Sequence, residues 1–162
     1  MKRKRHSNLL GLALALGACA GSCVATPLPQ PPSLELDIEK LSIDSGPGEP
    51  VVIVGEPDAV SIGGIDIRVT PGPTDTDPVL EIGNASVAAD GSFTVIVVSP
   101  LENTYFFERI DGATDEFFAA ITIDSSGNIS EGDPGPDADG DGSPDEIDCA
   151  PDDETLVGQR CN

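Results

Sequence analysis

Short runs of β-branched residues, each closed by a turn signal, recur along residues 34–130 and constrain the fold most strongly. Val51–Val54 is a continuous apolar run that ends at Gly55, and it predicts a strand buried on both sides or at the centre of a sheet. Residues 65–69 alternate apolar and polar side chains and are followed by prolines. No segment shows a sustained helical period, and the 18 glycines and 15 prolines favour turns over long helices.

Other segments of the same region extend this pattern. Residues 34–38 alternate leucine or isoleucine with acids, which predicts an opening strand, and residues 80–87 predict one or two short strands. Asp90-Gly91 is a hairpin signal, and residues 105–110 and 117–123 form the expected last pair. Roughly seven short strands in about 100 residues are typical of an all-β fold, an antiparallel β-sandwich.

Five of the six aromatic residues fall in the last two predicted strands. Neighbouring residues of a strand point to opposite faces, so an exposed aromatic binding patch is one possible use. Core packing is the favoured use, because a domain with so few aromatic side chains needs them inside. The five residues are Tyr105, Phe106, Phe107, Phe117 and Phe118.

Three stretches resemble bacterial immunoglobulin-like domains: Gly55–Val60, Ala89–Val95 and the ending Ile123–Ser130, which carries an Asp-x-x-Gly-Asn-x-Ser run. The resemblance implies an immunoglobulin-like β-sandwich over residues 34–130 that acts as a spacer or as a binding module. The Cys…Trp…Cys pattern of antibody-type domains is absent, since the chain has no tryptophan.

The N-terminus has the pattern of a secretory signal. Four of the eight basic residues lie within the first five positions, and an apolar run, Leu9–Ala18, follows. A spanning helix needs about 20 apolar residues, so this run is too short to cross a membrane.

Leu16–Cys19 resembles a bacterial lipobox, in which a lipid is attached to the cysteine after cleavage before it. The resemblance implies a signal peptide of residues 1–18, lipidation at Cys19 and, because Ala20 is not acidic, sorting to the outer membrane. Residues 19–33 would then form a proline-rich linker, extended where polyproline II holds.

Two alternatives to this anchor remain open. An ordinary signal peptide cut near Ala18, Ala20 or Ala25 would give a secreted protein, and Cys23 is a second, weaker lipidation candidate. In an oxidising compartment, Cys149 and Cys161 are a natural disulfide pair, which leaves Cys23 unpaired if Cys19 is lipidated. The disulfide would contribute about 3 kcal/mol by the loop-entropy estimate.

The acidic C-terminal segment carries the strongest chemical signal. The formal net charge is -21, and 11 of the 29 acids lie within residues 131–154. Counted from Asp137, carboxylates fall at positions 1, 3, 5, 9 and 12 with glycine at position 6, which is the ligand spacing of a calcium loop. Oxygen ligands without histidine favour Ca²⁺ over zinc or copper. The predicted ligands are Asp137, Asp139, Asp141, Ser143 through its carbonyl, Asp145 and Asp148.

Prolines on both sides of this loop disfavour the flanking helices of an EF-hand. Residues 137–161 instead resemble a thrombospondin type 3 repeat, with Ser143 where an apolar residue is common and Asp148 followed directly by Cys149. The resemblance implies that residues 131–162 form an irregular tail that is ordered by calcium and pinned by a disulfide. The alternative is an acidic tail that stays extended by charge repulsion.

Charge and composition also exclude some functions. The negative charge repels nucleic acid and anionic lipid, so we expect no nucleic-acid partner and membrane contact through the lipid anchor only. The only histidine, His6, lies in the signal segment, so a Ser-His or Cys-His couple is not expected in the mature chain. A small hydrolase that uses paired carboxylates is a third, disfavoured hypothesis.

The sequence therefore predicts a non-enzymatic lipoprotein of the bacterial cell envelope, expected at the outer membrane, with secretion as the second choice. It would bind calcium through the acidic repeat and serve a structural or adhesive role. The alternative function is an immunoglobulin-like binding module for a protein or glycan ligand, in which calcium only stiffens the tail.

Overall fold

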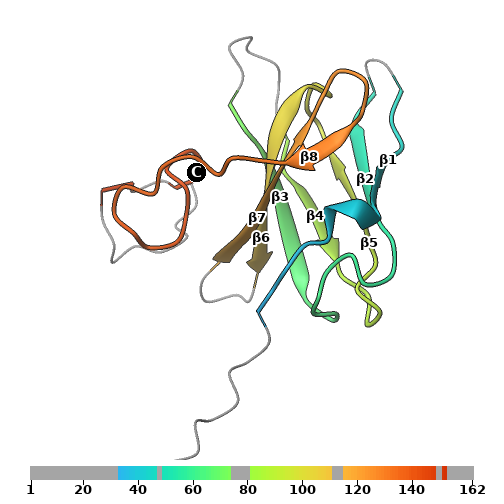
Figure 1. Ribbon diagram of the computed structural model, residues 1–162, viewed down its shortest axis with the longest axis horizontal. Coiled ribbons are helices and arrows are strands. Elements are labelled where there is room, and N and C mark those ends of the chain that lie inside the picture. Colours follow the sequence, from blue (N-terminus) through green and yellow to red (C-terminus); the bar gives the residue numbers. More distant parts are fainter. Residues whose placement is uncertain (1–32, 47–48, 74–80, 111–114, 149–150, 153–162) are drawn as a thin grey trace, which may run out of the picture. The chain divides into compact units, whose positions relative to one another are not determined.

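The chain folds into two antiparallel β-sheets in a computed structural model that describes residues 33–46, 49–73, 81–110, 115–148 and 151–152 (Figure 1). One sheet has three strands in the order β1-β2-β5, and the other has five in the order β4-β3-β6-β7-β8. In the described part of the chain, a 3-10 turn, η1 (Ile38–Lys40), precedes the strands. The strands are β1 (Leu41–Ile43), β2 (Val51–Gly55), β3 (Asp66–Pro71), β4 (Gly83–Ser86), β5 (Phe93–Val97), β6 (Asn103–Ile110), β7 (Asp115–Ile123) and β8 (Ile129–Glu131). The predicted all-β class with antiparallel sheets is confirmed.

The core lies between the inner faces of the two sheets. The predicted central strand is confirmed, since β2 pairs with β1 on one side and with β5 on the other. Val51 and Ile53 are fully buried and belong to the same apolar cluster as side chains of the second sheet. The fully buried members contributed by that second sheet are Ile67, Val69, Tyr105, Phe107, Ile121 and Ile123.

The aromatic side chains pack inside rather than forming an exposed patch. The Phe107 ring lies 6.1 Å from the Phe93 ring and 6.2 Å from the Phe118 ring, both edge-on. Phe106 points to the other face of β6, yet it is also fully buried and pairs with Phe117 at 6.4 Å. Core packing is confirmed for Tyr105, Phe106 and Phe107, which are fully buried, whereas Phe117 and Phe118 are half-buried.

The predicted opening strand at residues 34–38 is wrong. Leu36 forms one isolated bridge with Val60, and the chain then turns into η1 instead of extending. The cause is local, because the Asp37 carboxylate accepts a hydrogen bond from the backbone N–H of Glu39 at 3.1 Å and caps the turn. The first true strand begins only at Leu41.

Two predicted features, one a hairpin and one a last strand, take a different form in the structure. Asp90-Gly91 is a tight turn with Gly91 at φ +83°, but the strands that it joins, β4 and β5, belong to different sheets, so it makes no hairpin. Ile123–Ser130, which resembles the last strand of immunoglobulin-like domains, instead spans the end of β7, a turn at residues 124–128 and the start of β8. The Asp124 carboxylate organises this turn by accepting hydrogen bonds from Ser126 and Asn128, which hold its pKa below the ordinary value.

A buried charge cluster lies on the second sheet. Arg68 on β3 contacts Asp115 on β7 at 2.6 Å and Glu108, its direct neighbour on β6, at 3.5 Å. Each of the three residues is 6% exposed. Burial raises the pKa of Glu108, and Asp115 adds to this rise while Arg68 opposes it. The alternating pattern in β3 predicted the strand but not the burial of its arginine.

The aromatic packing makes Phe107→Ala strongly destabilising. Loss of a fully buried ring that contacts two other rings is expected to cost about 3–5 kcal/mol of unfolding free energy. Urea denaturation measures this change. Ile82→Ala, at a side chain that is 53% exposed, is the control and is expected to change stability by less than about 0.5 kcal/mol. Equal losses in both variants would contradict the placement of the core.

Removing the cation of the buried cluster should destabilise the protein in a pH-dependent way. Arg68→Met removes a cation that the buried carboxylates of Glu108 and Asp115 both contact, at an expected cost of about 3–5 kcal/mol near neutral pH. A carboxyl whose pKa is raised on folding lowers stability as the pH rises above its ordinary pKa of 4.5, and loss of Arg68 raises the pKa of Glu108 further. The deficit relative to wild type should therefore shrink as the pH falls toward that value. Unfolding curves across this range that show a constant deficit would contradict the assignment.

Candidate metal centre

The predicted calcium loop turns sharply at its glycines. Gly142, at the sixth position, has φ +97°, a conformation that favours glycine because it carries no Cβ. The Asp137 carboxylate spans this turn, since it accepts hydrogen bonds from the backbone N–H of Gly140 at 2.7 Å and of Gly142 at 3.1 Å. The turn brings the carboxylates of the first three predicted ligands to one place.

Asp139 and Asp141 each commit only one carboxylate oxygen to the backbone. Oδ1 of Asp139 accepts from the N–H of Asp141 at 3.2 Å, and Oδ1 of Asp141 accepts from the N–H of Ser143 at 2.7 Å. Their Oδ2 atoms are buried and accept no hydrogen bond within the described part of the chain. Buried carboxylate oxygens without a donor are unfavourable, so these two atoms are free to bind a cation.

The three acids Asp137, Asp139 and Asp141 form a group in which one carboxylate oxygen of each lies within 4.8 Å of the others. Burial raises the pKa of Asp139, and the nearby charges of Asp141, Asp148 and Asp137 add to this rise, while the hydrogen bond from the Asp141 backbone opposes it. A divalent cation among these oxygens would offset the repulsion that raises this pKa.

The other predicted ligands take different positions. Ser143 and Asp148 are buried, at 3% and 8% exposure, and the charge of Asp148 is felt at Asp139. Asp145 lies outside the group of three, and its Oδ1 accepts a hydrogen bond from the Ala138 backbone at 2.8 Å. This bond ties the second half of the loop to the first. The spacing of the acids did not predict this hydrogen bond, because an aspartate at the ninth position of the loop is equally compatible with a role as a metal ligand.

The donor set is suited to a hard cation. Every candidate ligand atom is an oxygen, from carboxylates or from a backbone carbonyl, as Ca²⁺ prefers. Mg²⁺ demands a tighter octahedron and retains several waters, so it fits this donor set less well. The residues present therefore fit calcium by their chemistry.

Several predicted sites lie outside the described residues. These are the lipidation site Cys19 with the signal segment 1–18, and the disulfide cysteines Cys149 and Cys161. Among the residues that the structure does describe, no helix is long and apolar enough to span a membrane.

Comparisons with protein-family models, with curated proteins and with solved structures give no significant match. The fold and the acidic group alone therefore define the class of protein. It is an all-β protein in which two antiparallel sheets are followed by an aspartate-rich loop that could hold a metal ion.

Proposed function

We propose that this protein is a non-enzymatic calcium-binding component of the bacterial cell envelope with a structural or adhesive role. One observation carries the proposal: two buried Oδ2 atoms, of Asp139 and Asp141, have no hydrogen-bond donor and lie beside a third carboxylate, that of Asp137. Calcium would neutralise this group and hold the loop in its turn. We expect the C-terminal tail to be extended without the ion and ordered with it.

We also propose that the two sheets form an immunoglobulin-like sandwich. The order β1-β2-β5 corresponds to strands A, B and E of that fold, and β3, β6 and β7 correspond to C, F and G. Tyr105, near the start of β6, donates a hydrogen bond from its hydroxyl to the backbone carbonyl of Pro100 at 2.7 Å. A tyrosine near the start of strand F that bonds back to the preceding backbone is a hallmark of immunoglobulin domains. Strand β4, beside β3, takes the place that variable-type domains give to C′.

The proposed location rests on the N-terminal pattern. A short apolar run that ends in Leu16–Cys19 supports export and lipid attachment at Cys19, with the outer membrane as the favoured site and secretion as the alternative. The proline-rich linker would hold the sandwich away from the lipid surface.

A second candidate function is a binding module for a protein or glycan ligand. One observation favours it: a groove at the side of the sandwich with apolar and acidic walls, lined by residues of η1, β7 and β8.

Calcium binding is tested by calorimetric titration of the full chain after removal of metal with a chelator. We expect a Kd of about 10⁻⁴–10⁻³ M, the range of extracellular calcium modules. Asp141→Asn removes a ligand charge and should weaken binding about tenfold or more. Backbone hydrogen exchange in residues 137–148 should slow when calcium is added.

The matched control is Glu56→Gln, which makes the same charge change at an exposed acid outside the loop. It should bind calcium as the wild type does. Absence of heat and of any exchange change at several millimolar calcium, well into the expected range, would overturn the proposal. Equal weakening in both variants would show that general charge screening, and not this loop, is responsible.

The lipid anchor is tested by metabolic labelling with radioactive palmitate in a bacterial host. Label is expected in the wild type and in Cys23→Ala and should be lost in Cys19→Ala, because the thiol of Cys19 follows the Leu-Gly-Ala motif. Palmitate label that is lost in Cys23→Ala and kept in Cys19→Ala would assign the lipidation site to Cys23 instead. A wild-type protein that is exported without label would favour the secreted form.

A further inference from the structure

A groove of about 570 Å³ runs along one side of the sandwich. It lies between the N-terminal segment that contains η1 and the part of the second sheet where β7 meets β8. Its walls comprise residues 34–39, residues 117–120, Glu131, Gly132 and Pro134. No residue of this groove belongs to the calcium loop 137–148.

One wall of the groove is a sheet edge that is only half paired. Strand β7 pairs with β6 from Asp115 to Ile123, whereas β8 covers only Ile121–Ile123. The last bond on this edge joins the N–H of Gly132 to the carbonyl of Ala120 at 3.0 Å. Within the described part of the chain, no strand pairs with residues 116–119 on the β8 side, and residues 117–119 line the groove. An edge of this kind is a template for a further strand.

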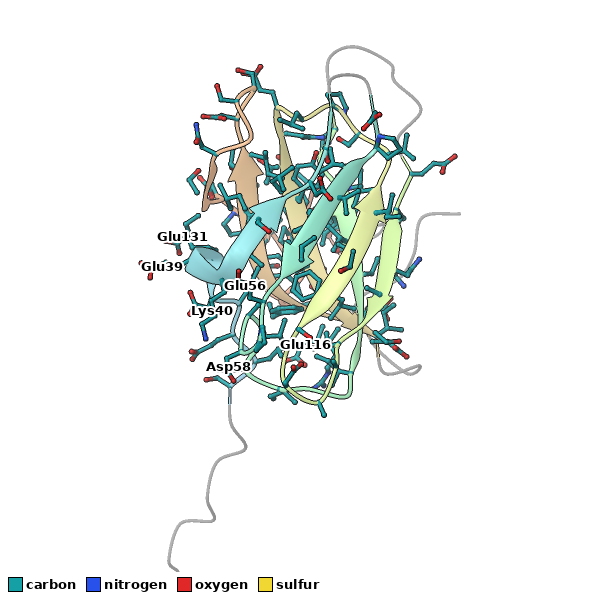
Figure 2. The ribbon with its side chains drawn as sticks, turned by 90° about the vertical axis from the view of Figure 1, so that its right-hand side faces the viewer. Glu39, Lys40, Glu56, Asp58, Glu116 and Glu131 are labelled. Atoms are coloured by element: carbon teal, nitrogen blue, oxygen red, sulfur yellow. The ribbon has the colours of Figure 1, made fainter. Side chains whose placement is uncertain are left out.

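The remaining walls combine apolar side chains with acids. Leu34, Leu36, Phe117 and Phe118 are half-buried apolar residues that line the groove. The acidic lining residues are Glu35, Asp37, Glu39 and Glu131. Figure 2 shows Glu39 and Glu131 beside η1. The adjacent base, Lys40, is directed to Asp58, with Nζ 3.4 Å from the carboxylate.

We propose that this groove binds an extended peptide of a partner protein that alternates basic and apolar residues, and that the peptide adds as a strand to the open edge of β7. Main-chain hydrogen bonds to the edge would supply affinity, and alternate side chains would meet the apolar and acidic walls. The charge of the walls selects a basic occupant. A second copy of this chain fits poorly, because each copy carries a net charge of -21. The inference goes beyond the proposed calcium binding and does not depend on it.

The probe is a fluorescein-labelled nonapeptide that alternates lysine and valine, titrated into the full chain and followed by fluorescence anisotropy. Two matched peptides accompany it, one with glutamate in place of lysine and one with N-methyl groups on alternate backbone nitrogens. Only the unmodified lysine peptide is expected to bind. Binding should slow the hydrogen exchange of those amides of residues 116–119 that face this edge, because strand addition covers them.

Charge-reversal variants then locate the site. Glu39→Lys/Glu131→Lys should weaken binding about tenfold or more and reduce its salt dependence, because it reverses two charges at the groove. The control Glu56→Lys/Asp44→Lys makes the same net charge change at acids that are absent from the groove lining, and it should weaken binding less than about threefold. Asp141→Asn should leave peptide binding unchanged while it weakens calcium binding, so the two proposals can fail separately.

Three outcomes would overturn the inference. One is failure of the lysine peptide to bind. Another is equal binding of the N-methylated peptide, which would show charge attraction without strand addition. The third is a dimer of the unliganded protein in sedimentation that is lost in Glu39→Lys/Glu131→Lys, which would assign the groove to a second copy. Two results together would support it: slower exchange of the edge-facing amides of residues 116–119, and binding that is weakened in Glu39→Lys/Glu131→Lys but not in the control Glu56→Lys/Asp44→Lys.

Discussion

The structure depends on the burial of two apolar faces against each other, one from β2 and β5 and one from β3, β6 and β7. Val51 and Ile53 are buried on one side of this contact, and Tyr105 and Phe107 on the other. Neither sheet could remain folded alone, because each would expose the apolar face that the other covers.

The acidic loop follows a different physical rule. It has little apolar surface to bury, so its shape comes from backbone N–H groups that donate to aspartate side chains, as those of Gly140 and Ser143 do. The bonds from the N–H groups of Asp141 and Ser143 use one oxygen of Asp139 and one of Asp141, and the second oxygen of each has no hydrogen-bond partner in the described part of the chain. The local bonds that shape the turn therefore leave free the two oxygens to which the proposed cation would bind.

Much of the fold could be predicted from the sequence because its signals are local. The strand Val51–Val54 was predicted from a continuous apolar run, and the gathering of three aspartates was predicted from their spacing. One failure was local, because the Asp37 cap turns residues 37–39 away from the expected opening strand. The other failures depended on partners that only the folded chain brings together. Asp90-Gly91 marks a turn, but nothing local says whether the next strand stays in the same sheet. The burial of Arg68 depends on Glu108 and Asp115, which approach it only through strand pairing, and the bond from Ala138 to Asp145 likewise becomes visible only after the loop has closed.

The buried charge cluster has a consequence for the alignment of the second sheet. Arg68, Glu108 and Asp115 come from three successive strands of that sheet and meet at one point on one face. A slip of β3 by one residue would turn Arg68 toward the apolar core and away from the two buried carboxylates that it contacts. A register shifted by one residue therefore costs more free energy in this sheet than it would in a sheet whose strands carried only apolar side chains at these positions. Three charges that add little net stability specify which residues of these strands face one another.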